Sequence, residues 1–502
     1  MLLAELVSAL APLRLSGSLD KKITGLAYDS RLVEPGNLFV AIPGFNQDGH
    51  EFLAEAAARG AVAAIISRDI PVPEQLTSIL VTDSRRALAA LAEKFFDYPS
   101  RQLRLIGVTG TNGKTTTTWL IDSLLRAAGY PVGIIGTVLV RIGNSSQPAV
   151  RTTPESLDLQ QFLARMVEAA ASHAVLEVSS HALALDRVAG CEFDVAVFTN
   201  LTQDHLDLHG NMQEYLAAKS QLFSQLSNNG KPRKLAVINL DDAAAPFLLE
   251  KTRVPALTYG IKGPANLRAK EISISESGSR FQVWLHNEPL GFTSVPTPGY
   301  FSVYNALAAI AVAIHEGVPW SLVQELLPAT QAVPGRFQPI RKGQPFTVII
   351  DYAHTPGGLK NVLETARSFV DGRIIVVFGC GGDRDRGKRA LMGKVASQLA
   401  DVIILTADNP RSEDPTQIAA DIAKGIAADK DVTIILDRAL AIQRAIALAC
   451  PGDAVLVVGK GHETYQIFAE RIIHFDDREV AEQALEVAIN EKMDFRRGSS
   501  SS

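Results

Sequence analysis

The run Gly110-Thr111-Asn112-Gly113-Lys114-Thr115-Thr116 limits the possible fold more than any other part of the chain. It follows a largely apolar stretch, 103–108, and precedes a helical pattern, 119–128. In a strand, turn and helix of this kind, backbone N–H groups and the helix N-terminus face a phosphate, the lysine neutralises it, and the first threonine hydroxyl can hold Mg²⁺. Val108 stands where the longer form of the motif has its first glycine, so the match is to the G-x-x-G-K-T core. We therefore expect this segment to bind ATP or GTP.

The composition is typical of a large globular protein. With 502 residues, 47% of them hydrophobic and 21% charged, the chain has room for about three domains. The net charge of −5 and the scattered Lys and Arg provide no basic surface, so we expect no nucleic-acid partner. Because no apolar run reaches membrane-spanning length and the N-terminus lacks a signal-peptide pattern, we expect a cytoplasmic protein without membrane insertion. We expect it to be a monomer.

The cysteines indicate a reducing compartment. Cys191, Cys380 and Cys450 are odd in number and far apart, which fits neither a disulfide framework nor a cysteine-based zinc site. We expect all three to be small buried packing residues.

Two breaks divide the chain into three segments. Asp97-Tyr98-Pro99-Ser100 ends a helical pattern, 87–96, and Val333-Pro334-Gly335 precedes a second alternation of strands and helices. We therefore expect domains at 1–100, 101–334 and 335–502, in an α/β fold with a central parallel sheet of the P-loop ATPase type and a second parallel sheet in the third domain. The predicted strands are 174–178, 195–199 and 235–239 in the second domain, and 347–350, 374–378, 402–406, 432–436 and 454–458 in the third.

Polar residues that follow apolar strands are candidates for function, because ligands collect beyond the carboxyl ends of parallel strands. Glu177 lies within an apolar run, where a carboxylate is costly to bury without a cation such as Mg²⁺. His205 follows the strand at 195–199 and could ligate a second metal, although a lone histidine is more often a satisfied polar group. Lys219 lies in the next helical pattern. Taken alone, it is interpreted as a lysine on the solvent-exposed face of a helix.

Motifs in all three segments together resemble those of the Mur ligase family. The matching motifs are Asp29-Ser30-Arg31, Gly44 to His50, Gly110 to Thr116, Thr152-Thr153-Pro154, Glu177 to His181, Asn200 to His205, Asp351-Tyr352-Ala353-His354, Gly379 to Arg389, Asp408-Asn409-Pro410-Arg411 and Gly459-Lys460-Gly461-His462-Glu463. The resemblance implies an N-terminal uridine-nucleotide-binding domain, a central ATP-binding domain and a mobile, Rossmann-like C-terminal domain that binds an amino acid. Domain closure is then part of the mechanism.

The resemblance implies a two-step ligation in peptidoglycan precursor synthesis. The D-glutamate side-chain carboxylate of UDP-N-acetylmuramoyl-L-Ala-D-Glu attacks the γ-phosphate of ATP, and the amine of meso-diaminopimelate then displaces phosphate from the acyl phosphate. Bringing two anions together calls for Mg²⁺ and for Lys114. By carry-over from the family, Thr115 and Glu177 hold a first Mg²⁺, and Glu177, His205 and Lys219 serve a second. Since an ammonium cannot ligate Mg²⁺, the family carries a carbamate on this lysine, formed with CO₂.

Further contacts follow from the resemblance, residue by residue. The ATP site is completed by Asn305, Arg336, Asp351 and His354. The uridine nucleotide and the muramoyl dipeptide are held by Ser30, Phe45, Asn46, Gln47, Thr152, Thr153, Ser179 and Arg187. The amino acid is held by Arg384, Asp408, Asn409, Pro410, Arg411, Gly459 and Glu463. Arg151, Leu185 and Ser302 depart from residues common in the family at their positions.

The choice of amino acid depends on Asp408-Asn409-Pro410-Arg411, since a guanidinium can take the distal carboxylate of meso-diaminopimelate with two hydrogen bonds. Three alternatives remain. A folylpolyglutamate synthase or a lysine-adding relative would share the phosphate loop and Lys219, but the first should lack the uridine-domain motifs and both should lack the complete set at 408–411. The third is a catalytically idle scaffold. The intact set of Lys114, Glu177, His205 and Lys219 argues against it.

Overall fold

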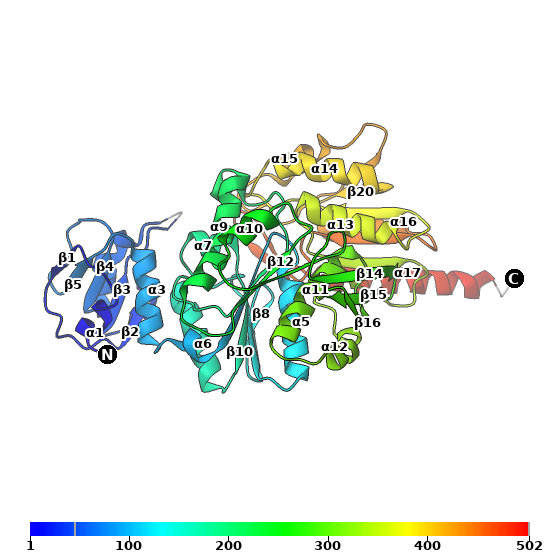
Figure 1. The fold of residues 1–502 in the computed structure, drawn as a ribbon. Helices are drawn as coiled ribbons and strands as arrows, with labels where there is room; N and C mark the ends of the chain where they lie inside the picture. Colours follow the sequence, from blue (N-terminus) through cyan, green and yellow to red (C-terminus); the bar gives the residue numbers. More distant parts are fainter. Residues whose placement is uncertain (45–46, 500–502) are drawn as a thin grey trace.

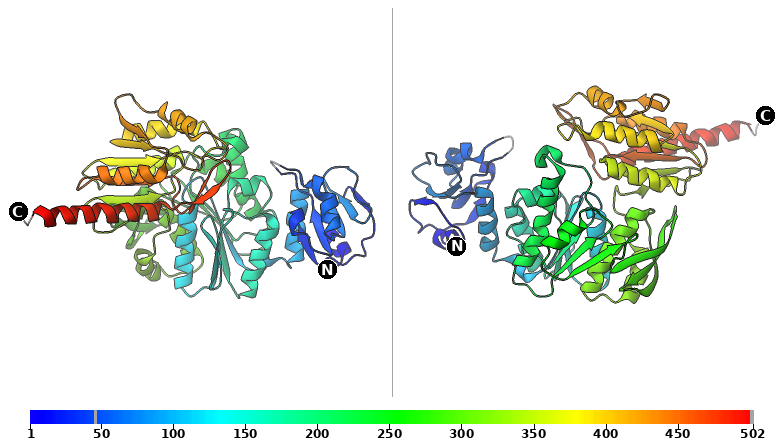
Figure 2. Two further views of the ribbon diagram at one scale, coloured as in Figure 1. Left: turned by 180° about the vertical axis from the view of Figure 1, so that it is seen from behind. Right: turned by 45° about the horizontal axis from the view of Figure 1, so that its top comes forward.

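The computed structural model of the chain describes residues 1–44 and 47–499, with side chains as far as residue 488. Three larger sheets follow one another along these residues, with five, eleven and six strands. The central sheet lies between the other two units, and the last helix extends away from the molecule (Figures 1 and 2). Among the described residues, no helix is long and apolar enough to cross a membrane.

The first sheet has the order β1-β5-β4-β3-β2 and is parallel except for β1. Its inner strands β3 and β4 are fully buried, as expected where helices cover both faces. Its elements are α1 (Leu3–Val7), β1 (Arg14–Ser16), β2 (Gly25–Ala27), β3 (Asn37–Val40), α2 (Leu53–Ala58), β4 (Ala63–Ile66), β5 (Thr77–Leu80), α3 (Ser84–Phe95) and α4 (Pro99–Gln102). Between α3 and α4, Asp97 and Tyr98 both have positive φ, of 58° and 51°.

The central sheet has the order β16-β15-β14-β13-β12-β11-β6-β10-β7-β8-β9. Its strands are β6 (Arg104–Thr109), β7 (Val132–Ile135), β8 (Leu139–Ile142), β9 (Ser145–Pro148), β10 (His173–Glu177), β11 (Val195–Phe198), β12 (Leu235–Asn239), β13 (Ala256–Gly260), β14 (Leu267–Ser275), β15 (Gly278–Leu285) and β16 (Glu288–Val295). The expected parallel sheet is present from β14 to β7, but both edges are extended by antiparallel strands. The sheet is therefore mixed.

Helices cover both faces of the central sheet, and alternate residues of each strand supply the two cores. Ile106 and Val108 of β6 pack with α5 (Lys114–Ala127) and the apolar α11 (Tyr300–His315). Leu105 packs on the opposite face with residues of α6 (Ser156–Glu168) and α9 (Met212–Asn228). Figure 1 shows α6 and α9 on one side of the sheet and α5 and α11 on the other. The remaining helices of this unit are α7 (Ser180–Ala184), α8 (Leu206–His209), α10 (Ala245–Lys251) and α12 (Trp320–Leu326).

The third sheet has the order β17-β18-β22-β19-β20-β21 and is parallel except for β17. This doubly wound arrangement is Rossmann-like, as predicted. Its elements are β17 (Gln338–Pro339), β18 (Thr347–Asp351), α13 (Pro356–Arg367), β19 (Ile374–Phe378), α14 (Lys388–Leu399), β20 (Val402–Leu405), α15 (Pro415–Ala423), β21 (Asp431–Ile434), α16 (Arg438–Leu448), β22 (Ala454–Val458), the hairpin β23 (Tyr465–Ile467) and β24 (Ile472–His474), and α17 (Asp477–Ser499).

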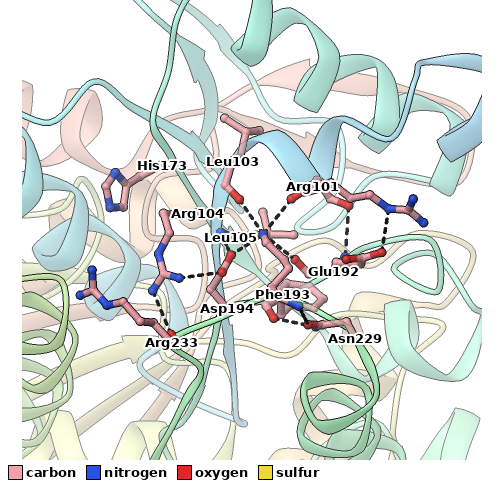
Figure 3. Close-up of polar contacts among 12 residues, drawn as sticks. Arg101, Leu103, Arg104, Leu105, His173, Glu192, Phe193, Asp194, Asn229 and Arg233 are labelled. Atoms are coloured by element: carbon pink, nitrogen blue, oxygen red, sulfur yellow. Dashed lines mark hydrogen bonds and ion pairs between the residues drawn. The ribbon is translucent and has the colours of Figure 1, made fainter.

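A buried ion network lies at the N-terminal ends of β6 and β11 (Figure 3). Arg104 Nη1 donates to Asp194 Oδ1 at 2.7 Å, and Arg104 Nη2 donates to Glu316 Oε1 at 2.6 Å. Lys231 also donates to the Asp194 carboxylate, whose side chain is 1% exposed. The network therefore ties together the two strands that support the phosphate-binding turn at their opposite ends.

One expectation about the cysteines is wrong. Cys191 and Cys380 are buried, but Cys450 is exposed. It lies in the turn between α16 and β22, where it cannot serve as a packing residue.

Candidate active site

The predicted phosphate-binding turn joins β6 directly to α5. Gly110 and Gly113 have φ values of +146° and +87°, which L side chains rarely adopt. A Cβ at Gly110 would lie 1.9 Å from Thr199 Oγ1, and one at Gly113 would lie 2.4 Å from Asn305 Oδ1. Both glycines are therefore required by backbone conformation and by close packing.

Two lysine side chains converge on this turn. Lys114 Nζ donates to the carbonyl oxygens of Gly110 and Thr111, at 2.9 and 2.8 Å. Lys219 projects from α9 and donates to the same Gly110 oxygen at 2.8 Å. Lys219 is 1% exposed, so it is not the solvated helix lysine that its local sequence suggests. Burial and the neighbouring Lys114 ammonium hold the pKa of Lys219 well below its usual range.

Glu177 ends β10 and is fully buried. Its carboxylate accepts hydrogen bonds from the Thr115 hydroxyl at 2.9 Å, and from the Thr137 backbone N–H and hydroxyl at 2.7 and 3.0 Å. Within the described residues it forms no ion pair with Lys, Arg or His. A buried carboxylate beside a threonine hydroxyl offers the hard oxygen ligands that Mg²⁺ prefers, so these residues fit the predicted metal.

His205 has a positive φ of 56° and lies directly before α8. Burial lowers the pKa of His205 to about 2, and the positive charges of nearby groups add to this, so the imidazole is neutral and able to bind a metal. His205 and Lys219 both lie against Tyr215. The ring centroids of His205 and Tyr215 are 6.2 Å apart, and Lys219 Nζ lies 4.4 Å from the centroid of the tyrosine ring. No group of three or more His, Cys, Asp or Glu in the described part of the chain could hold a metal, so a metal site here needs Thr115 or a modified Lys219.

Asp204 links the central unit to the third one. Its carboxylate lies 3.4 Å from His205 Nε2, 3.7 Å from His354 Nε2 and 3.6 Å from Lys388 Nζ. Although burial opposes ionisation, the neighbouring His354 and Lys388 hold the pKa of Asp204 far below its usual range. Arg336 makes a second link, donating from Nη2 to Thr115 Oγ1 at 3.0 Å.

Two cavities open beside this cluster. The first, of about 560 Å³, is bordered by six of the residues predicted to bind ATP: Asn112, Gly113, Thr116, Asn305, Arg336 and Asp351. The second, of about 680 Å³, is bordered by residues of the central and third units: Arg151, Thr152, His205, His354, Arg384, Asp408, Asn409, Arg411, Gly459 and Glu463. Thr115 contacts Arg336 of the first cavity, and Glu177 contacts Thr137 of the second, so one hydrogen-bonded set joins the two.

The loop at 408–411, which is predicted to bind the amino-acid substrate, is hydrogen-bonded to β23. Arg411 has a φ of 54°, and its backbone N–H donates to Ile467 O at 3.0 Å. Its Nη1 donates to Gly382 O at 2.7 Å, which fixes the direction of the guanidinium. Gly459 lies beside the loop with a φ of +117°, and a Cβ there would lie 2.5 Å from Asp408 Oδ2. Pro410 borders neither cavity, and its carbonyl accepts the Glu413 N–H.

The residues predicted to hold the dipeptide form a connected group. Thr153 donates to Glu177 O at 2.8 Å and accepts the Ser179 N–H at 3.1 Å, and Arg187 Nη1 donates to Thr153 O at 3.3 Å. Ser302, one of the departures from the family pattern, is buried and donates to Pro298 O at 3.0 Å.

Of the residues predicted to hold the uridine nucleotide, Ser30 and Gln47 are described, and both lie in the first unit and border neither cavity. Ser30 donates to Glu55 at 3.0 Å, and Gln47 is exposed. Phe45 and Asn46 lie outside the described residues.

Several residues of the site were not predicted, among them Asp204 and Tyr215. Thr137 donates to Glu177, and Lys388 lies against Asp204. Lys460 donates to Asn409, one of the residues predicted to bind the amino-acid substrate. Thr137 follows the apolar strand β7, so the search for polar residues after strands could have found it. The two lysines lie within the matching motifs, but nothing in the local sequence separates them from surface lysines.

The fold and the site together define a phosphate-loop enzyme in which a nucleotide cavity and a second ligand cavity share one cluster of buried charged residues. Family models match most of the chain: "Mur ligase family, catalytic domain" at 22–96, "Mur ligase middle domain" at 108–313, and "Mur ligase, glutamate ligase domain" at 335–461. The chain belongs to the Mur ligase family.

Similar proteins cover nearly the whole chain. A UDP-N-acetylmuramoyl-L-alanyl-D-glutamate–2,6-diaminopimelate ligase of Geobacillus thermodenitrificans is 49% identical over 468 residues, which is 92% of this chain and 95% of that protein. The protein of the same name from Syntrophomonas wolfei is 46% identical over 487 residues, covering 97% and 99% of the two chains. A solved structure of a ligase of this name has a TM-score of 0.67 and 33% identity, covering 97% of this chain and 99% of that one.

Proposed function

We propose that this chain is an ATP-dependent amide ligase that joins meso-diaminopimelate to the D-glutamate side-chain carboxylate of UDP-N-acetylmuramoyl-L-Ala-D-Glu. The observation that carries this proposal is the set Arg336–Thr115–Glu177–Thr137, which connects a nucleotide cavity to a second cavity whose lining includes Arg384, Arg411, Asp408 and Glu463. The nearly full-length relatives of that name support the choice of reaction.

The reaction needs two anions to meet. A carboxylate oxygen attacks the γ-phosphorus and ADP leaves; the amine nitrogen then attacks the acyl carbon, phosphate leaves and the nitrogen loses a proton. Lys114 and Arg336 supply fixed positive charge beside the phosphates. When bound, Mg²⁺ adds charge neutralisation at the reacting oxygens, with Thr115 and Glu177 as its ligands from this chain.

Lys219 is the residue we assign to a carbamate. Only a neutral amine attacks CO₂, losing one proton to leave a carbamate anion, and the lowered pKa of Lys219 favours that neutral form. The carbamate would place two oxygens beside the phosphate-binding turn. His205, neutral and in contact with the same tyrosine, would complete the second metal site with Glu177.

The second cavity suits an amino acid with a zwitterionic far end. Arg384 and Arg411 face the same space as Asp408 and Glu463. A carboxylate and an ammonium on one carbon would therefore find partners of opposite charge, whereas the side chain of lysine offers only the ammonium.

We assign the three units to residues 1–100 for the uridine nucleotide, 101–334 for ATP and 335–502 for the amino acid. Each has its own sheet. All the site residues come from one chain, so a monomer completes the site. A cytoplasmic location follows from the substrates, since ATP and a uridine nucleotide are cytoplasmic metabolites.

The test is the release of ADP. It should require UDP-N-acetylmuramoyl-L-Ala-D-Glu, Mg²⁺ and meso-diaminopimelate together. Equal turnover without the dipeptide nucleotide would contradict the ligase, and faster turnover with L-lysine would indicate the lysine-adding alternative. An absence of ADP release under all conditions would favour the scaffold.

A further inference from the structure

We propose that Lys460 is a positioning residue for amino-acid specificity, which holds the side chains of Asn409 and Glu463 in one fixed arrangement. This inference rests on the proposed function, because it concerns the site assigned to meso-diaminopimelate. Lys460 directly follows Gly459 beyond the end of β22, and its side chain is 0% exposed.

The three side chains form a closed triangle. Lys460 Nζ donates to Asn409 Oδ1 at 3.2 Å and to Glu463 Oε2 at 3.1 Å. Asn409 Nδ2 donates to the same Glu463 oxygen at 2.8 Å. The Ile467 backbone N–H also donates to Asn409 Oδ1, at 3.0 Å. Both Asn409 and Glu463 border the second cavity, whereas Lys460 lies behind them.

This arrangement fixes what the cavity presents to a ligand. Because two donors meet Asn409 Oδ1, the amide must direct its Nδ2 towards Glu463. Because two donors meet Glu463 Oε2, the other carboxylate oxygen is left for a ligand ammonium. Without Lys460, the amide of Asn409 can turn over and Glu463 can move towards a nearby arginine such as Arg411.

Support of the 407–411 backbone does not explain why Lys460 is buried here. Gln466 Nε2 donates to the carbonyls of Ala407 and Asp408, at 3.2 and 2.9 Å, and Arg411 N–H donates to Ile467 O. These bonds hold the 407–411 backbone without Lys460. A buried ammonium is also a poor way to stabilise a fold, since an apolar side chain of similar size serves as well or better. What Lys460 alone provides is the orientation of two cavity side chains.

The experiment compares Lys460→Met with Lys430→Met, measuring kcat and KM for each of the three substrates. Lys430 is a half-buried lysine of the same unit that directly precedes β21, donates to Ala400 O and borders neither cavity. Lys460→Met should raise the KM for meso-diaminopimelate about tenfold or more, the loss expected for hydrogen bonds to charged groups. The KM values for ATP and the dipeptide nucleotide should stay within about twofold, and Lys430→Met should change none of them.

A double-mutant cycle separates positioning from general damage. In a Glu463→Gln background, Lys460→Met should have a clearly smaller effect on the KM for meso-diaminopimelate, because one partner is already altered. If Lys460→Met does not fold, Lys460→Gln replaces it in both measurements. Equal rises in all three KM values, or full additivity in the cycle, would overturn the proposal for Lys460. Wild-type protein that releases no ADP with meso-diaminopimelate would instead overturn the proposed function.

Discussion

Lys114 and Lys219 donate to the same carbonyl oxygen, that of Gly110, at 2.9 and 2.8 Å. Two ammonium groups this close repel each other, and burial removes the water that would screen them. The pKa of each is lowered by burial, and the charge of Lys114 lowers that of Lys219 further. The pair therefore favours one charged lysine at the phosphates and one neutral amine that can react with CO₂.

The first prediction concerns Lys219. Lys219→Ala should lose nearly all ligase activity, since neither the carbamate nor its two oxygens can form, and added short-chain carboxylates should restore part of it. Lys251→Ala removes an exposed lysine of the same unit and should leave activity unchanged. ADP release with all substrates present is the measurement. Near-normal turnover of Lys219→Ala would remove Lys219 from the catalytic set.

The second prediction concerns the ion network at the far ends of β6 and β11. Asp194→Asn should lower the free energy of unfolding by about 3 kcal/mol, because Arg104 and Lys231 keep their buried charges and lose a partner. Asp69→Asn, at an exposed pair with Arg14, should cost less than about 1 kcal/mol. Urea denaturation of both variants makes the comparison. Similar losses for the two would show that the network adds little to stability.

The third prediction concerns His181, which lies on α7 between Ser179 and Arg187, two of the residues predicted to hold the dipeptide. Burial, with smaller contributions from His209 and Arg187, lowers the pKa of His181 to about 4. The unfolded chain takes up a proton near pH 6.5 that the folded chain takes up only near pH 4, so stability should fall as the pH drops through that window. The slope from one such group is at most about 1.4 kcal/mol per pH unit.

His181→Gln should make this acid-side fall shallower, as followed by the urea midpoint between pH 7 and pH 4 in the presence of a chelator. His474→Gln is the contrasting variant. Glu479 raises the pKa of His474, so removing that histidine should change the slope in the opposite sense. If the two variants change the slope in the same direction, the neutral state assigned to His181 is wrong.

The strands that the sequence predicts best are those buried on both faces. β12, β19 and β22 begin and end at the predicted residues, because each holds a continuous apolar run that directly follows a charged residue. The hairpins β14–β16 and β7–β9 were not predicted. The strands β8, β9 and β14 to β16 are partly exposed and carry scattered polar residues, so they lack that pattern, and their antiparallel pairs make the central sheet mixed rather than parallel. β7 is apolar and fully buried, but it is only four residues long and contains Gly133, so its signal is weak.

In the candidate site, too, a residue could be predicted where its local sequence is unusual, and could not be predicted where its role depends on segments far away in the sequence. Glu177 could be predicted, because a carboxylate at the end of an apolar strand is locally unusual. The burial of Lys219 could not be predicted from its helix, because it depends on a turn at Gly110 that lies far away in the sequence. The partners of Lys460 are likewise brought together only by the packing of β23 against the 408–411 loop.

The fourth prediction separates the proposed reaction from that of a lysine-adding relative. With Arg411 in place, L-lysine leaves a guanidinium without a carboxylate, and sites built around a polar partner reject analogues that lack it by roughly 10⁴-fold or more. Arg411→Ala removes both the attraction for the distal carboxylate and the unpaired charge that penalises lysine. Activity with meso-diaminopimelate should fall steeply while the ratio of kcat/KM for the two amino acids narrows. Arg386→Ala, which removes an exposed arginine of the same unit, should leave that ratio unchanged. If Arg411→Ala also leaves it unchanged, Arg411 does not recognise the distal carboxylate, and the choice of meso-diaminopimelate loses its main structural support.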